Sequence, residues 1–168
     1  MKIVNLDLNN TKQLNKLMPL YFNYESELTK LKIEEIFDQE KPKENELYFI
    51  DYFSRGINTL LLIDEDDILG FISYNIDSDD VPGYANGYKG FGHIAEIYID
   101  NIYRNKGYAK KLVQSVELIF EKSKINDMYL VDINQNENLW KSLNYINTGI
   151  IEPEENGIIF TKKLKISK

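Results

Sequence analysis

The sequence predicts a mixed α/β (α+β) fold, in which a mostly antiparallel sheet of six to seven strands carries helices on both faces. Helical periodicity dominates residues 10–56, and two β-rich runs at 59–64 and 69–77 follow, separated only by a short turn as in an antiparallel hairpin. From residue 93 onward, strands and helices alternate. This order of elements is typical of one sheet that is covered on both sides.

The N-terminal part begins with an alternating run at residues 2–6, which predicts a short strand. Asn10 or Thr11 can cap the helix that follows. Its inward positions follow the spacing of an amphipathic helix and are Leu14, Leu17, Met18, Tyr21 and Phe22. Because Pro19 lies inside this run, we expect a kink or a break near Met18.

Two less regular helical segments come next. Residues 25–40 mix acidic and aliphatic side chains, which indicates an irregular helix. Asn45 can cap a third helix that ends near Gly56. The residues expected to face inward from this helix are Leu47, Ile50 and Phe53.

The second half of the chain has clearer boundaries. Residues 64–67 form the acidic turn of the hairpin, and a glycine-rich loop over 78–92 leads to a strand at 93–100. A helix beginning near Lys106 shows a clear 3.6-residue period. Its inward residues are Ala109, Leu112, Val113, Val116, Ile119 and Phe120. The remaining expected elements are a strand at 128–133, a short helix at 136–143, and strands near 145–151 and 158–164.

Length and composition limit the classes of protein. With 168 residues we expect a single domain spanning 1–168, and the net charge of −7 disfavours nucleic-acid binding. No apolar run reaches the roughly 20 residues of a membrane span, and the N-terminus does not resemble a signal peptide, so we expect a cytoplasmic protein with no membrane partner. The lack of cysteine excludes a thiolate nucleophile, and a single histidine, His93, predicts no metal site.

The most informative segment is residues 94–109, which reads as a buried strand, a short turn and the start of an amphipathic helix. The turn contains Arg104-x-x-Gly107-x-Ala109. Backbone N–H groups at a helix start have no partner within the helix, and the helix dipole favours an anion there. Gly107 allows close approach of a ligand, and Ala109 keeps the next position small. The segment therefore predicts a diphosphate site.

In this context the motif resembles the central motif of the GNAT superfamily of acetyl-CoA-dependent N-acetyltransferases, Arg/Gln-x-x-Gly-x-Gly/Ala. The run Asn138–Tyr145 is similar to the family's second motif, a short helix that usually ends in Tyr-x-x-x-Gly-Phe. The resemblance extends over the whole chain in its order of elements. Residues 94–145 are its specific part.

The resemblance implies acetyl-CoA as co-substrate and a set of residues that would contact it. The diphosphate would lie on the backbone of Asn105, Lys106, Gly107, Tyr108 and Ala109, with Arg104 nearby. The pantetheine arm would pair like an extra strand with Ile97, Tyr98 and Ile99, and an N–H near Ile99 would polarise the acetyl carbonyl. Asn134 would bind the pantetheine, and Trp140 would pack beside the thiol channel.

Glu96 is the candidate general base. The predicted strand places it on one face with Ile94 and Tyr98, and some family members carry a base glutamate at a comparable position. An alkylamine with a pKa near 10.4 is almost wholly protonated at neutral pH, so attack requires a proton acceptor. The alternative interpretation is a structural acid that is bonded to the backbone or to arginine.

The second motif departs from the family pattern at the position of its tyrosine acid. Trp140 stands there, and an indole cannot give up its proton. Asn144-Tyr145 replaces the usual Gly-Phe pair, and Tyr145 is a weak candidate for a substitute acid. Its alternative interpretation is an aromatic residue of the core. A thiol near pKa 8.5 is a fair leaving group without such an acid.

These observations predict transfer of an acetyl group to a primary amine by direct attack in a ternary complex, because no cysteine is present for a covalent relay. The acceptor would be a small cationic amine, such as a polyamine or an aminoglycoside, or a peptide amine. Tyr84 and Tyr88 of the glycine-rich loop would line its site unless the loop is a mobile surface segment. The alternatives are a noncatalytic acyl-CoA-binding regulatory module and a coenzyme A-independent interaction domain. The closing strands at 145–164 suggest a homodimer.

Overall fold

The computed structural model describes residues 1–37 and 40–165, and its centre is one seven-stranded sheet. The strands are β1 (Lys2–Asn5), β2 (Asn58–Asp64), β3 (Asp67–Ile76), β4 (Gly92–Ile99), β5 (Asp127–Asp132), β6 (Ile146–Glu152) and β7 (Gly157–Lys163). Their order across the sheet is β1-β2-β3-β4-β5-β7-β6. Every neighbouring pair is antiparallel except β4 and β5, which are parallel. The predicted fold class is confirmed.

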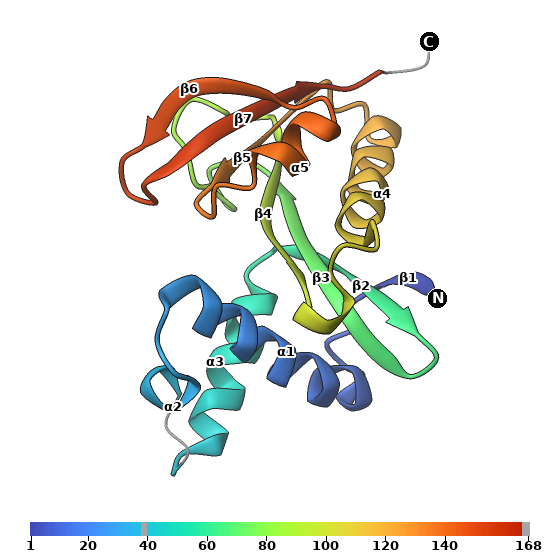
Figure 1. The fold of residues 1–168 in the computed structure, drawn as a ribbon, viewed down its shortest axis with the longest axis vertical. Helices are drawn as coiled ribbons and strands as arrows, with labels where there is room; N and C mark the ends of the chain where they lie inside the picture. Colours follow the sequence, from blue (N-terminus) through green and yellow to red (C-terminus); the bar gives the residue numbers. More distant parts are fainter. Residues whose placement is uncertain (38–39, 166–168) are drawn as a thin grey trace.

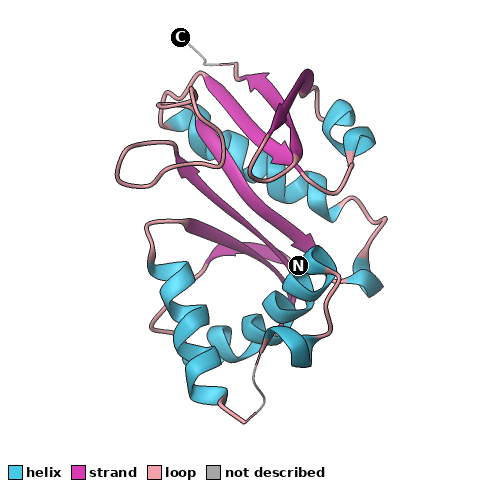
Figure 2. Cartoon of the chain, turned by 90° about the vertical axis from the view of Figure 1, so that its left-hand side faces the viewer, coloured by secondary structure: helices cyan, strands magenta, loops and turns pink. Residues whose placement is uncertain are grey.

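Helices cover both faces of this sheet. The helices are α1 (Thr11–Thr29), α2 (Ile33–Ile36), α3 (Pro42–Ser54), α4 (Tyr108–Lys122) and α5 (Glu137–Ser142), with a 3-10 turn η1 (Asn101–Tyr103). In Figure 1, α1, α2 and α3 gather at the lower end, α4 and α5 lie at the upper end, and β3 and β4 run between them. Figure 2 shows the helices on either side of the strands. Within the described part of the chain, no helix is long and apolar enough to cross a bilayer.

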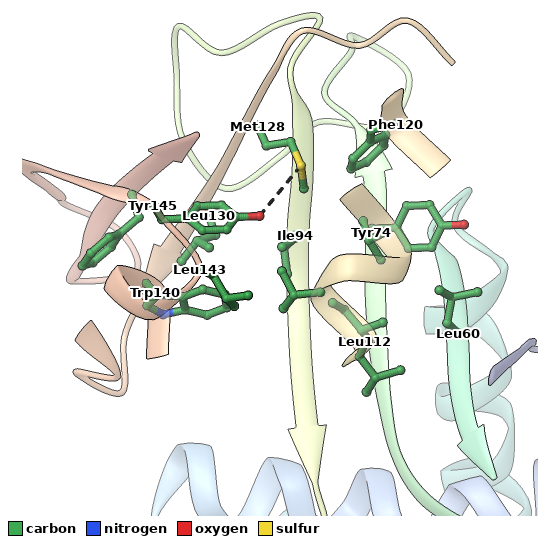
Figure 3. Close-up of a cluster of buried hydrophobic side chains, with 14 of the residues drawn as sticks. Leu60, Tyr74, Ile94, Leu112, Phe120, Met128, Leu130, Trp140, Leu143 and Tyr145 are labelled. Carbon is green, nitrogen blue, oxygen red and sulfur yellow. Dashed lines mark hydrogen bonds between the residues drawn. The ribbon is translucent and has the colours of Figure 1, made fainter. Parts of the chain in front are cut away.

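Successive side chains of β2 and β3 pack into two separate cores, as the two-residue period of a strand requires. Leu61 and Phe71 pack with α1 and α3, whereas Leu60 and Ile72 pack with α4 and α5. Figure 3 shows part of the second core, where Leu112 and Phe120 of α4 meet residues of β3, β4 and β5. Burial on both faces explains the nearly continuous apolar runs in the central strands.

The predicted break at Pro19 does not occur. α1 runs without interruption from Thr11 to Thr29, and the side chain of Asn10 caps it by accepting from the N–H of Gln13 at 3.1 Å. An internal proline costs a helix about 3 kcal/mol. The three buried side chains that surround it in the helix, those of Leu17, Leu20 and Tyr21, contribute roughly 1.5 to 3 kcal/mol each, which exceeds that cost.

The later N-terminal helices also differ from the prediction. The expected helix over 25–40 is divided between the end of α1 and the four residues of α2. α3 begins at Pro42, in the first turn, where the fixed φ of proline suits a helix start, and not after a cap at Asn45. Phe49 and Phe53 are its buried residues, whereas Leu47 is 66% exposed.

A β-bulge in β4 changes the orientation of Glu96. Ser73 pairs with Glu96, but Tyr74 pairs with Ile94, so Ala95 is the extra residue of the bulge. Ile94 therefore packs in the α4 core, while Tyr98 packs in the α1 core. The prediction that Ile94 shares a face with Glu96 and Tyr98 is wrong, because it assumed strict alternation.

β4 and β5 pair over only a short distance. Gly92–Ile94 of β4 pairs with Met128–Leu130 of β5, and no further pairing between the two strands follows. β4 continues to Ile99 and remains hydrogen-bonded to β3 on its other side. Beyond the bulge, the N–H and C=O groups of β4 that point toward β5 therefore have no partner strand among the described residues, and they leave a gap between the two strands.

Replacing Gly70 by alanine is expected to destabilise the sheet beside this edge. A Cβ at Gly70 would lie 2.4 Å from the backbone oxygen of Tyr98 and 2.5 Å from Cδ1 of Ile99. Because backbone cannot move aside cheaply, we expect the free energy of unfolding to fall by about 2 to 3 kcal/mol. Urea denaturation measures this change, and an unchanged midpoint would contradict the packing described for β3 and β4.

β6 forms one edge of the sheet and exposes three isoleucine side chains, Ile146, Ile150 and Ile151. An exposed edge strand can pair with another chain. The homodimer stays a prediction.

Candidate active site

The turn between β4 and α4 has the backbone of an anion site. Asn105 and Gly107 both adopt left-handed conformations, with φ of 62° and 77°, and Gly107 occupies the N-cap position of α4. Lys111 donates to the oxygen of Gly107, so the N–H groups of Tyr108, Ala109 and Lys110 precede the first hydrogen bond of the helix. These donors lie at the positive end of the helix dipole. The arrangement suits a phosphate group.

The space above Gly107 is open. A Cβ built at this position meets no atom within 4 Å, so glycine is required here by its backbone conformation and not by a neighbouring side chain. An approaching ligand can therefore reach the main chain directly.

A cavity of about 690 Å³ extends from this turn along the open edge of β4 to the end of α1. All the residues predicted to contact a coenzyme line it, except Lys106 and Trp140. Those that do are Ile97, Tyr98, Ile99, Arg104, Asn105, Gly107, Tyr108, Ala109 and Asn134. Sequence reasoning missed Tyr24, Glu27 and Leu28, which α1 contributes. Their helical spacing signals only a buried face, not a ligand site.

Arg104 is directed toward α1. Its Nε donates to the oxygen of Ile99 at 2.8 Å, and its Nη2 donates to both carboxylate oxygens of Glu27, at 2.9 and 2.7 Å. The side chain of Lys106 lies over the ring of Tyr103, with Nζ 5.4 Å from the ring centroid. Both cations thus have partners within the protein, whereas the N–H groups at the start of α4 have none within the helix.

Glu96 is buried on the α1 side of β4, with 8% of its surface exposed. Burial raises the pKa of its carboxyl group to about 8, with a further contribution from Glu25, while the hydroxyl groups of Tyr52 and Tyr24 oppose the shift. Within the described residues, Glu96 Oε2 and Tyr52 Oη have no hydrogen-bond partner of good geometry. One carboxyl oxygen is thus available to take up a proton. Tyr24, whose hydroxyl group acts on Glu96, also lines the cavity.

Acidic and phenolic groups surround Glu96. Burial, then Glu96, and then Glu155 and Glu25 raise the pKa of Tyr84 well above its ordinary value, and the same groups act on Tyr24. Glu25 belongs to α1, and Glu155 to the turn between β6 and β7. Carboxylates from two distant segments therefore act on the phenols that surround Glu96.

Of the two loop tyrosines predicted to line an acceptor site, Tyr84 lies near Glu96, whereas Tyr88 stacks on Tyr129, with ring centroids 4.5 Å apart.

His93 packs beneath the loop, and its Nδ1 is 2.9 Å from Oδ1 of Asn75. Burial lowers the pKa of His93 to about 4, so it is neutral at physiological pH. Within the described residues, no group of three metal-binding side chains lies close together.

Trp140 and Tyr145 lie in the core. Their rings meet edge to face, with centroids 5.6 Å apart, and the hydroxyl of Tyr145 donates to the sulfur of Met128 at 3.8 Å (Figure 3). Burial and then Glu117 raise the pKa of Tyr145 well above 10. Leu139, the neighbour of Trp140, lines the cavity, whereas neither aromatic residue does. Contact of Trp140 with a coenzyme and the role of Tyr145 as an acid stay predictions.

Comparisons with known proteins identify the family and the fold. The model of the acetyltransferase (GNAT) family matches residues 22–145. An aminoglycoside 6'-acetyltransferase type Ii has a similar structure, with 14% identity, full coverage of both chains and a TM-score of 0.68. The PaiA N-acetyltransferase of Thermoplasma acidophilum, in complex with coenzyme A, has 17% identity, coverage of 97% of this chain and 99% of its own, and a TM-score of 0.64.

An aminoglycoside 6'-N-acetyltransferase complexed with coenzyme A is also similar, with 15% identity, coverage of 100% and 99%, and a TM-score of 0.68. A search of the curated proteins finds no match. At these identities the solved structures establish the fold, while the family model establishes the membership. The chain belongs to the GNAT family of acetyltransferases.

Proposed function

We propose that the protein transfers an acetyl group from acetyl-CoA to a primary amine by direct attack in a ternary complex. The main support for this proposal is that one cavity includes both the start of α4 at Gly107 and the unpaired edge of β4. One end offers donors for a diphosphate, and the strand edge offers donors and acceptors for the amide groups of a pantetheine arm. Asn134 lines the same cavity and can bind that arm.

The main chain of Ile99 is suited to polarise the acetyl carbonyl. Asp100 donates its N–H to Leu69 on β3, and successive N–H groups of a strand point in opposite directions. The N–H of Ile99 therefore points to the open side of β4. A fixed donor of this kind stabilises the oxyanion that forms when an amine attacks the carbonyl.

Glu96, which does not itself line the cavity, would accept through an intervening water the proton that the ammonium group must lose before or during attack. Its buried carboxyl group has a pKa of about 8, which is close to working pH and suits a general base. The rest of the catalytic effect would come from holding the amine and the thioester together. The thiolate leaves without an acid from the second motif, because its pKa is low enough.

A cationic acceptor fits the surroundings of Glu96. Glu25 and Glu155 act there on the phenols of Tyr24 and Tyr84, while the carboxyl group of Glu96, with a pKa of about 8, is mostly neutral at pH 7. Carboxylates and aromatic faces both attract ammonium groups. We therefore favour a small amine with more than one positive charge, and a peptide amine is the second choice.

The alternative is a noncatalytic acyl-CoA-binding regulatory module. The burial of Trp140 and Tyr145 in the core favours it, because neither side chain lines the cavity where a thiol would leave. A thiol-release assay with acetyl-CoA and a panel of monoamines, polyamines, aminoglycosides and peptides separates the two functions. We expect turnover that is fastest with polycationic amines. Binding of acetyl-CoA without turnover on any acceptor would favour the module.

A further inference from the structure

Glu27, near the end of α1, is bound to the first residue of the Arg104–Ala109 motif. Nη2 of Arg104 donates to Oε1 and Oε2 of Glu27, at 2.9 and 2.7 Å, across 77 residues of sequence. The hydroxyl of Tyr98 donates to Oε1 at 2.6 Å. Glu27 is thus held by two side chains from the end of β4 and the turn that follows.

Arg104 is fixed on its other side by β4. Its Nε donates to the oxygen of Ile99 at 2.8 Å, and its guanidinium carbon lies 5.2 Å from the centroid of the Tyr98 ring. Ile99 is the residue whose N–H we expect at the acetyl carbonyl. A single arginine therefore connects the diphosphate turn, the end of the catalytic strand and α1.

These side chains line the cavity between its two functional ends. Arg104 and the residues after it border the end that suits a diphosphate, whereas Tyr24 and Glu27 border it from α1. Tyr24 lies one helical turn before Glu27, and its ring centroid is 5.7 Å from that of Tyr98. Tyr24 is also one of the two phenols that lower the pKa of Glu96.

We propose that Glu27 is a positioning residue, whose contact with Arg104 transmits coenzyme binding at residues 105–109 to α1 and fixes Tyr24 beside Glu96. We call this contact the Glu27–Arg104 clamp. The inference rests on the proposed function in one respect, the binding of coenzyme A at that turn. Its consequence is that coenzyme binding prepares the acceptor side, so the two substrates bind with positive coupling.

Exposure of the pair supports a role in position more than in stability. The side chains of Arg104 and Glu27 are 40% and 46% exposed. Ion pairs with this much contact with water contribute little to folding. A mutation of Glu27 should therefore change the contact between α1 and the Arg104–Ala109 turn more than it changes the free energy of unfolding.

Hydrogen exchange followed by mass spectrometry tests the clamp in the full chain with and without coenzyme A. In the wild type we expect coenzyme A to slow exchange in the turn at 104–110 and, by about five-fold, in the end of α1 at 23–30. In Glu27→Gln and Glu27→Ala, the turn should respond as before while the end of α1 no longer responds. Asp51→Asn, which breaks a more exposed pair between α3 and its C-cap residue Arg55, should keep both responses.

The outcomes separate this inference from the proposed function. Equal slowing of α1 in the wild type and in both Glu27 variants would overturn the clamp and leave the coenzyme site intact. No response of the turn in the wild type would overturn the coenzyme site and, with it, the clamp. Because the comparison is between bound and free forms of each variant, a general loss of stability would not imitate the expected result.

Discussion

Replacing Glu96 by glutamine is expected to lower kcat by about 10² to 10³-fold with the best acceptor of the panel. Glutamine keeps the size and the buried position of the side chain but cannot take up the proton of the ammonium group. The binding of coenzyme A should change little, because Glu96 does not line the cavity at the Arg104–Ala109 turn, where we propose that the coenzyme binds. Steady-state thiol release and calorimetry measure the two effects separately.

The dependence of this activity on pH provides a second readout. Glu96 acts as a base only when it is ionised, and its pKa is raised to about 8 by burial. In the wild type kcat/KM should therefore rise as the pH increases through about 8. In Glu96→Gln the increase of kcat/KM near pH 8 that depends on Glu96 should disappear. Only the increase that comes from deprotonation of the amine substrate should remain. A wild-type profile that is flat between pH 6 and 9 would contradict the role of Glu96.

Stability should change with pH in the opposite direction. The ordinary pKa of the glutamate is 4.5, and in the folded protein it is about 8, so between these values the folded state holds a proton that the unfolded chain has released. The free energy of unfolding contributed by Glu96 then falls as the pH rises through this window. Glu96→Gln removes that loss, and its stability relative to wild type should increase by about 4 kcal/mol from pH 5 to pH 9, because the difference between the two pKa values covers about three pH units of this range.

Replacing Gly107 by glutamate is expected to weaken coenzyme A binding by at least about 100-fold. The new side chain would adopt an unfavourable left-handed φ of 77° and would place a carboxylate at the helix start where a diphosphate should bind. Calorimetric titration of the variant with coenzyme A measures the loss.

Gly149→Glu is the matched control for this variant. Gly149 has a φ of 72° and, like Gly107, open space at the position of a Cβ, but it lies on β6. It should bind coenzyme A as the wild type does. Equal weakening in both variants would show that added charge and strain, and not the site, caused the effect.

The sequence predicted the sheet, α4 and the diphosphate turn because each has a local signal. The period of α4, the acidic hairpin turn and the Arg104–Ala109 motif all lie within short segments. The continuity of α1 through Pro19 could not be predicted in this way, because burial against β3 decides it. The same is true of Phe49, which takes the inward position expected for Leu47.

The site shows the same division between local and distant information. The residues that surround the turn were predicted from the motif, whereas the direction of Arg104 was not, since its partner Glu27 lies 77 residues away. The bulge at Ala95 has no signal in an alternating apolar run. It nevertheless determines that Glu96 faces the phenols of α1 and α3. Contacts between distant segments thus decide the surroundings of Glu96 and the direction of Arg104, whereas local sequence decides the backbone of the 104–109 turn.

The central claim is that backbone amides at residues 105–109 bind a diphosphate, and a calorimetric comparison of coenzyme A with pantetheine tests it most directly. Pantetheine carries the arm and the thiol but lacks the diphosphate. The account predicts one molecule of coenzyme A bound per chain and at least about 100-fold weaker binding of pantetheine, since that ligand leaves the helix start unused. Equal affinity for the two ligands, or no heat with coenzyme A, would contradict it.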